Sequence, residues 1–196
     1  SGNKILSEKL DFENSVILVL DVDNDNDLDL YIGSGSVELS KFSEKLYDRI
    51  YINNGKGKFN LSGQKLPDVD HKISTGTASF EDIDKDGDLD IFVGERLKIN
   101  NYGLPSSGFM LVNDGKGNFS NQTQKLSPEL NEIGMITDSE FSDIDNDGDK
   151  DLVIVGEYMG IEIFTNDNGY FSRLKSDLGE LKGWWNEIQI EDLNND

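Results

Sequence analysis

The chain has 196 residues, which is enough for one compact domain or two small ones. Its 39 acidic residues outnumber its 18 lysines and arginines, so the formal net charge is −21. Nucleic acids and anionic membrane surfaces are bound through clustered cations, and this charge argues against both as partners. The absence of cysteine excludes a disulfide framework, a thiolate metal site and a cysteine nucleophile. No apolar stretch approaches the roughly 20 residues that span a bilayer, so we expect no membrane insertion by this segment.

The first repeated unit begins with an aspartate-rich segment, residues 21–29, in which every second residue is aspartate. An apolar run over 28–33 follows, and residues 50–59 combine another apolar run, an Asn-Gly pair and a phenylalanine. Asn-Gly between strand-like runs is the strongest local hairpin signal, because the tight turn requires positive φ. The connection between the two runs holds the best helix candidate, residues 41–46. Residues 4–12 are interpreted as the tail of an earlier unit.

The second unit repeats this pattern 61 residues later, with its aspartate-rich segment at 82–90. Its apolar runs and its hairpin signal at 110–119 predict four strands, with the aspartate loop between the first two and a long connection between the second and third. The predicted strands cover residues 75–81, 89–94, 108–113 and 118–122.

The third unit begins after another 61 residues, with aspartates over 143–151 and a hairpin signal at 163–171. A fourth segment begins at Asp192 and includes Asn194 and Asp196, but it lacks the rest of the pattern, so we expect that site to be empty or disordered. Four strands every 40 to 60 residues are typical of β-propeller blades. The predicted fold is therefore all-β, a single partial propeller over residues 1–196. Its approximate blades are 14–72, 73–135, 136–182 and an incomplete 183–196.

Three blades and part of a fourth are too few to close a ring, since propellers have at least four. We expect a fragment of a larger propeller, completed by further blades of the same parent or of another chain.

Five aspartates on one short loop repel one another, because each pair at ~5 Å costs roughly 3 kcal/mol at an effective dielectric of ~20. A hard divalent cation removes this penalty, and Ca²⁺ takes 6 to 8 oxygen ligands at about 2.4 Å with tolerant geometry. The spacing suits side-chain ligands at loop positions one, three, five and nine, with the backbone carbonyl at position seven. We expect a structural Ca²⁺ in each of three loops. The predicted metal-binding residues are Asp21, Asp23, Asp25, Asp27 and Asp29; Asp82, Asp84, Asp86, Asp88 and Asp90; and Asp143, Asp145, Asp147, Asp149 and Asp151.

Other interpretations of the loops explain the sequence less well. An EF-hand requires glutamate at position twelve and flanking helices, whereas that position holds Ile32, Val93 and Ile154 within strand-like runs. Mg²⁺ prefers to keep several waters, and Zn²⁺ lacks histidine or cysteine ligands. Solvating turn aspartates would not produce three gapless copies of nine residues. Position six must turn sharply, which suits Gly87 and Gly148, and Asn26 is the best substitute there.

The loops and the hairpins resemble the FG-GAP repeat class, also called VCBS repeats, of integrin α-chain propellers and many secreted bacterial proteins. More narrowly, residues 48–59, 93–96, 102–105 and 183–186 are similar to those of bacterial relatives of cartilage acidic protein. The resemblance covers nearly the whole chain and departs from the pattern at Asn26 and in the truncated fourth loop. It implies calcium binding and leaves adhesion, lectin-like and enzyme-associated roles open.

Successive strands run antiparallel, so the aspartate loops and the hairpins should share one face of the propeller. The long connections 34–48 and 95–107 should lie on the other face, where a protein or glycan ligand would bind, while the connection 157–160 is short. Phe42 and Tyr47 are also expected to fold back on their own loop, and His71 is expected to be a surface residue. Trp184 and Trp185 suggest a sugar-stacking platform, although one of them is expected in the core of the next blade. The candidate contact residues are Phe42, Tyr47, His71, Arg96 and Tyr102.

Two function classes fit this sequence, besides a purely architectural role. The first is an extracellular, cell-surface or periplasmic calcium-binding module for adhesion or ligand recognition, including glycan recognition, without catalysis. The second is an accessory propeller of a polysaccharide-processing enzyme. Catalysis within the chain is not expected, because it has one histidine, no nucleophile-elbow serine motif, and loop carboxylates already committed to metal.

Overall fold

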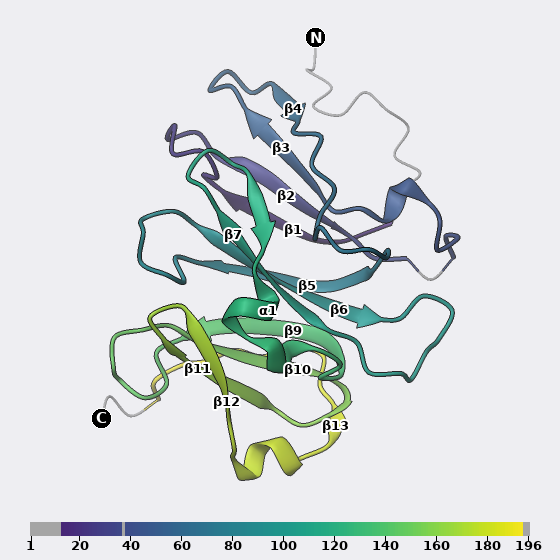
Figure 1. The fold of residues 1–196 in the computed structure, drawn as a ribbon, viewed down its shortest axis with the longest axis vertical. Helices are drawn as coiled ribbons and strands as arrows, with labels where there is room; N and C mark the ends of the chain where they lie inside the picture. Colours follow the sequence, from purple (N-terminus) through teal and green to yellow (C-terminus); the bar gives the residue numbers. More distant parts are fainter. Residues whose placement is uncertain (1–12, 37, 194–196) are drawn as a thin grey trace.

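The computed structural model describes residues 13–36 and 38–193, which form three antiparallel sheets stacked one after another (Figure 1). Each sheet is built on four strands in sequence order, as expected for successive propeller blades. The predicted all-β fold of partial propeller blades is therefore confirmed. The predicted tail at 4–12 and the fourth-loop residues Asn194 and Asp196 lie outside the described residues.

The first sheet contains one short helical element, a 3₁₀ turn at Glu44–Leu46 in the connection between its second and third strands. This turn occupies the last part of the predicted helix at 41–46. The four strands are β1 (Asn14–Leu20), β2 (Asp29–Ser34), β3 (Arg49–Asn53) and β4 (Phe59–Leu61).

The second sheet matches the predicted strands closely, but β6 continues past Gly94 because it pairs with β5 as far as Ser74 opposite Leu97. Glu95 and Arg96 therefore belong to a strand, and the expectation that the long connection begins at Glu95 is wrong. Helices α1 (Thr123–Leu126) and η2 (Pro128–Leu130) lead to the next sheet. The strands are β5 (Ser74–Glu81), β6 (Asp90–Leu97), β7 (Gly108–Asn113) and β8 (Phe119–Asn121).

The third sheet has an extra strand, because Trp184 of β13 (Gly183–Trp184) pairs with Glu157 at the end of β10. Beyond β13, the backbone N–H groups of Ile188 and Ile190 donate to side chains of β9, at 2.9 Å each. The first residues of the predicted fourth blade therefore lie along the third blade, beside β10 and then beside β9. The other elements are β9 (Met135–Ser142), β10 (Asp151–Met159), β11 (Glu162–Asp167), β12 (Tyr170–Leu174) and η3 (Asp177–Glu180).

The core consists of two apolar layers, one between each pair of neighbouring sheets. The middle sheet is covered on both faces: Val93 of β6 packs in the first layer, and its neighbour Phe92 packs in the second. This explains the continuous apolar run over 91–93, since alternate side chains of a strand point to opposite faces. Each fully buried side chain of this kind contributes about 1.5–3 kcal/mol.

Glycine is required where strands approach most closely. A Cβ on Gly76 of β5 would lie 2.2 Å from the backbone carbonyl oxygen of Ile136 in β9 of the neighbouring sheet. Within the third sheet, a Cβ on Gly156 of β10 would lie 2.1 Å from the backbone carbonyl oxygen of Met135 in β9. Backbone atoms cannot move aside as a flexible side chain can, so these positions set the distance between the strands.

None of the helices in the described residues is long and apolar enough to cross a membrane.

Candidate metal centres

Each aspartate loop brings carboxylate oxygens from three of its residues within 4.8 Å of one another. Two oxygens bound to one Ca²⁺ at about 2.4 Å can be no more than about 4.8 Å apart, so this spacing fits one cation per loop. The loops join the first two strands of each sheet, as predicted. The three groups are Asp21, Asp23 and Asp29; Asp82, Asp84 and Asp86; and Asp143, Asp145 and Asp151.

Not every predicted ligand enters these groups. Asp25 and Asp147, at position five of the first and third loops, lie outside them, as does Asp90 of the second loop. The ninth position has a second task that the sequence did not predict. Asp90 is fully buried, its Oδ2 accepts from the Ile83 N–H at 3.1 Å, and its Oδ1 accepts from the Asn113 N–H at 2.8 Å. It therefore closes its own loop and ties it to the hairpin.

Asp29 and Asp151, which are also fully buried, accept the same pair of backbone hydrogen bonds in the first and third loops.

Burial raises the pKa of Asp90 to about 7, although its two backbone hydrogen bonds act in the opposite direction. A nearby cation favours the charged form of such a carboxylate.

The first position shapes the turn. Asp82 accepts from the backbone N–H groups of Asp86 and Gly87, each at 3.1 Å. In the third loop, Asp143 Oδ2 accepts from Gly148 at 3.1 Å, while its Oδ1 is buried without a partner among the described residues. Asp23 Oδ1 is in the same situation. A buried carboxylate oxygen without a partner is costly, and a bound cation would satisfy both atoms.

The loops turn at two positions with left-handed backbone. The expectation for position six is confirmed, with φ of 68° at Asn26, 96° at Gly87 and 92° at Gly148. Position four also has positive φ, including 59° at Asn24 and 60° at Lys85. We did not predict this second turn, and its only sequence signal is asparagine at that position in two loops.

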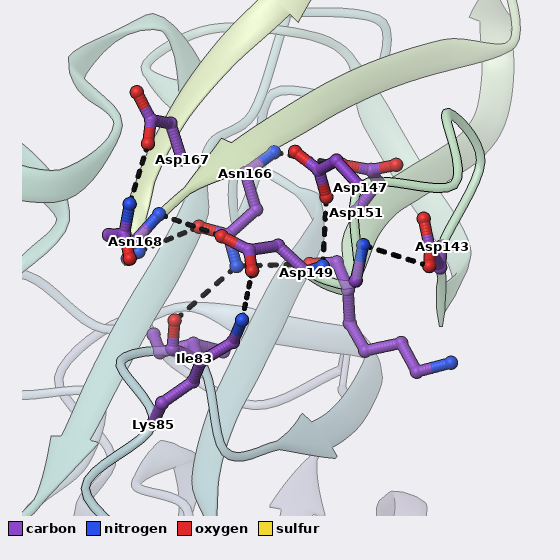
Figure 2. A network of polar contacts seen from close by, with 12 residues as sticks. Ile83, Lys85, Asp143, Asp147, Asp149, Asp151, Asn166, Asp167 and Asn168 are labelled. Carbon is purple, nitrogen blue, oxygen red and sulfur yellow. Dashed lines mark hydrogen bonds and ion pairs between the residues drawn. The ribbon is translucent and has the colours of Figure 1, made fainter.

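The residues at position seven are predicted to bind metal only through their backbone carbonyls. In the structure, their side chains also connect neighbouring loops. Asn24 of the first loop donates to Asp88 Oδ1 of the second at 2.6 Å. The ammonium group of Lys85 pairs in the same way with Asp149 of the third (Figure 2). This ion pair lowers the pKa of Asp149. Position four of one loop therefore reaches position seven of the next.

Asparagines near the ends of the third strands of the second and third blades link each blade to the preceding one through buried contacts. The Asn113 side-chain amide donates to the Val22 carbonyl of the preceding blade at 2.9 Å and to Leu89 of its own loop at 3.2 Å. Asn166 makes the equivalent contact with the Ile83 carbonyl of the preceding blade (Figure 2). It also donates to the Lys150 carbonyl of its own loop at 3.2 Å. The sequence predicts these residues only as part of the hairpin signal. In the first blade, the equivalent Asn53 side chain donates, among the described residues, only to the Leu28 carbonyl of its own loop, at 3.1 Å.

The family of FG-GAP-like repeats matches residues 21–93 and 143–196, which include all three aspartate loops. The chain belongs to the FG-GAP-like repeat family. Among curated proteins, none matches this FG-GAP-like repeat chain.

The opposite face of this FG-GAP-like repeat chain carries a cavity of about 500 Å³ between the first and second blades. Phe42, Tyr47 and His71 all line it, so the structure brings these three predicted contact residues together. Phe42 is 77% exposed, and the expectation that it folds back on its loop is wrong. Tyr47 is partly covered, because the Lys72 ammonium lies 3.0 Å from its ring centroid.

Arg96 and Tyr102 lie elsewhere on this face, where both bind Glu157 of the third blade, at 2.7 Å and 2.6 Å. Tyr158 packs edge-on against Tyr102 and against Trp184, with ring centroids 6.5 Å and 5.4 Å away.

Trp184 is 63% exposed and Trp185 is only partly buried. The expectation that one tryptophan lies in a core is therefore wrong for the described residues. The reason is that β13 pairs at the end of β10, where no described segment covers it, and the Trp185 ring N–H bonds to the nearby Leu181 carbonyl at 3.2 Å.

A pH-dependent stability is expected from Glu95, which also lines the cavity and is 1% exposed. Burial raises the pKa of Glu95 from its ordinary 4.5 to about 7, although Ser107, His71 and Lys98 act to lower it. The folded state then holds this proton to higher pH than the unfolded state, so the stability is complete below pH 4.5 and is lost as pH rises through 7.

Between pH 5 and 8, wild type should lose on the order of 3 kcal/mol of unfolding free energy relative to Glu95→Gln. Urea denaturation of both proteins in excess calcium measures this difference. A difference that does not change with pH would contradict the expectation.

Proposed function

We propose that the chain is a calcium-binding, noncatalytic recognition module that works outside the cytoplasm. The observation that carries this proposal is the threefold recurrence of loops whose carboxylate oxygens lie within 4.8 Å of one another. An extracellular site fits loops of this kind, since millimolar calcium fills even weak sites. Three bound Ca²⁺ would change the formal charge from −21 to −15, which still disfavours polyanionic partners.

The calcium would be structural. The ninth aspartate of each loop holds both the loop and the hairpin, and the position-seven side chains Asp88 and Asp149 hold the preceding blade. A cation between these groups would stabilise each blade and its junction. Ligands would bind on the opposite face, beyond the reach of the metal loops. The narrower likeness to bacterial relatives of cartilage acidic protein stays a prediction from the sequence.

A second candidate is an accessory role beside a polysaccharide-processing enzyme. The exposed rings of Tyr102, Tyr158 and Trp184, at 58–63% exposure, favour it because sugar rings stack on exposed aromatic side chains.

Chelation of three calcium ions is expected to lower the melting temperature by roughly 15–30 °C. Each site at 100 times its Kd contributes about 2.7 kcal/mol, and 1 kcal/mol shifts a domain of this size by about 2–4 °C. Thermal unfolding in excess calcium and in excess EDTA measures the shift, and calorimetric titration of the metal-free protein measures how many ions bind. An unchanged melting temperature would show that the loops hold no stabilising metal, and an equal shift with Mg²⁺ would overturn the choice of calcium.

A further inference from the structure

The cavity between the first two blades contains an unsatisfied buried acid. Glu95 Oε2 accepts from the Ser107 backbone N–H at 3.3 Å, but its Oε1 is buried without a hydrogen-bond partner among residues 13–36 and 38–193. A buried acceptor of this kind costs free energy unless a donor reaches it. Glu95 lines the cavity, so a ligand there can supply that donor.

The third blade shows what satisfies a glutamate at this place in the repeat. Gly94 and Glu95 of β6 correspond to Gly156 and Glu157 of β10, each pair following the apolar core of the second strand. Both oxygens of Glu157 accept from the preceding blade, one from Arg96 and one from Tyr102. The first blade offers Glu95 no such donor in the described structure. The cavity between the first and second blades therefore occupies the place that Arg96 and Tyr102 fill between the second and third blades.

Most of the other charges around the cavity are paired, and the Lys41 ammonium lies 5.2 Å from the centroid of the Phe42 ring. Lys72 lies 3.3 Å from Glu44, Lys98 lies 2.8 Å from Glu132, and His71 lies 2.9 Å from Asp70. Three lysines and three carboxylates line the cavity, which makes it neutral as a whole. A lining without net charge gives no preference for a charged ligand. A cation bound beside Glu95 would also lie close to His71 and Lys98, which already act on Glu95.

The aromatic side chains complete the chemistry. Phe42 is 77% exposed at the cavity and offers an apolar surface, while Glu95 requires an O–H or N–H donor. A ligand that is neutral, has an apolar face and carries several hydroxyl groups meets these conditions, and its size suits a cavity of about 500 Å³.

We propose that this cavity binds a neutral sugar ring, with one hydroxyl group donating to Glu95 Oε1 and the ring lying against Phe42. This proposal rests on the recognition role proposed above and gives it a site and a ligand class.

The test uses the calcium-loaded chain at pH 8, above the raised pKa of Glu95, so that its carboxylate is charged. The probes are the methyl glycosides of glucose, galactose, mannose and N-acetylglucosamine. Saturation-transfer NMR and calorimetric titration should detect at least one of them. Glu95→Gln keeps the shape of the side chain but removes the charged acceptor, and it should weaken binding by about tenfold or more, as loss of a charge-assisted hydrogen bond does. Glu157→Gln changes the corresponding buried acid of the third blade and is the matched control, expected to bind within about twofold of wild type.

Several outcomes would overturn the proposal: no glycoside binds, binding survives Glu95→Gln, or binding is lost in Trp184→Ala and so belongs to the exposed aromatic rings. Binding of arginine amide in preference to every glycoside would show that the cavity recognises a protein side chain. Calcium titration of the same samples separates the two proposals, because Glu95 lies away from the metal loops. Intact calcium binding without sugar binding would reject the cavity proposal alone.

Discussion

Asp90→Ala is expected to destabilise the calcium-loaded chain by about 5 kcal/mol. The substitution leaves the buried N–H groups of Ile83 and Asn113 without an acceptor, at about 1–3 kcal/mol each. Asp90 lies outside the group of Asp82, Asp84 and Asp86 but closes the loop that carries it, so the substitution also weakens the proposed metal site. Loss of a well-occupied ion costs about 2.7 kcal/mol. Urea unfolding in saturating calcium measures the total, and calorimetric titration should show one ion fewer.

Asp86→Ala is the matched control, since Asp86 belongs to the same loop but is exposed. It should weaken calcium binding, yet in EDTA it should leave stability unchanged or raise it, because it removes repulsion between neighbouring carboxylates. If both variants lost the same stability in calcium and in EDTA, the framework role of Asp90 would be refuted.

Asp48→Ala should cost about 4 kcal/mol in unfolding free energy, with or without calcium. Asp48 is fully buried and accepts from the Tyr31 hydroxyl at 2.5 Å, the Ser34 N–H at 2.7 Å and the Thr75 hydroxyl at 2.8 Å. Thr75 lies on β5 of the second sheet, so the carboxylate joins two blades. Alanine leaves three buried donors unpaired, at about 1–3 kcal/mol each before local rearrangement.

Thr75→Val removes one of these donors without changing the shape of the side chain much, and it should cost about 1 kcal/mol. The double variant should be less destabilised than the sum of the two, because Thr75 no longer has a partner to lose once Asp48 is absent. Chemical denaturation of the four proteins completes this cycle. Strict additivity would mean that the carboxylate does not hold the second blade.

Much of the fold follows from local signals that repeat along the chain. Alternating aspartates, apolar runs and Asn-Gly pairs place the loops, the second strands and the hairpins, because each depends on backbone conformations that a few adjacent residues decide. The left-handed turn at Asn26, Gly87 and Gly148 is an example, since only glycine and asparagine adopt it at low cost. The strand limits are less certain, and β6 extends to Leu97 only because β5 pairs with it that far.

The sequence by itself therefore determined the blade repeat, the all-β class and the clustering of carboxylates. Only the tertiary structure decided which groups meet across blades. Lys85 reaches Asp149, Asn113 reaches Val22, and Arg96 with Tyr102 satisfies Glu157 while Glu95 keeps an unpaired oxygen. These contacts join residues about 60 to 90 positions apart, and no periodicity within one unit records them. They depend on the distance and rotation between neighbouring sheets, which close packing at positions such as Gly76 and Gly94, both against Ile136 of the next sheet, sets.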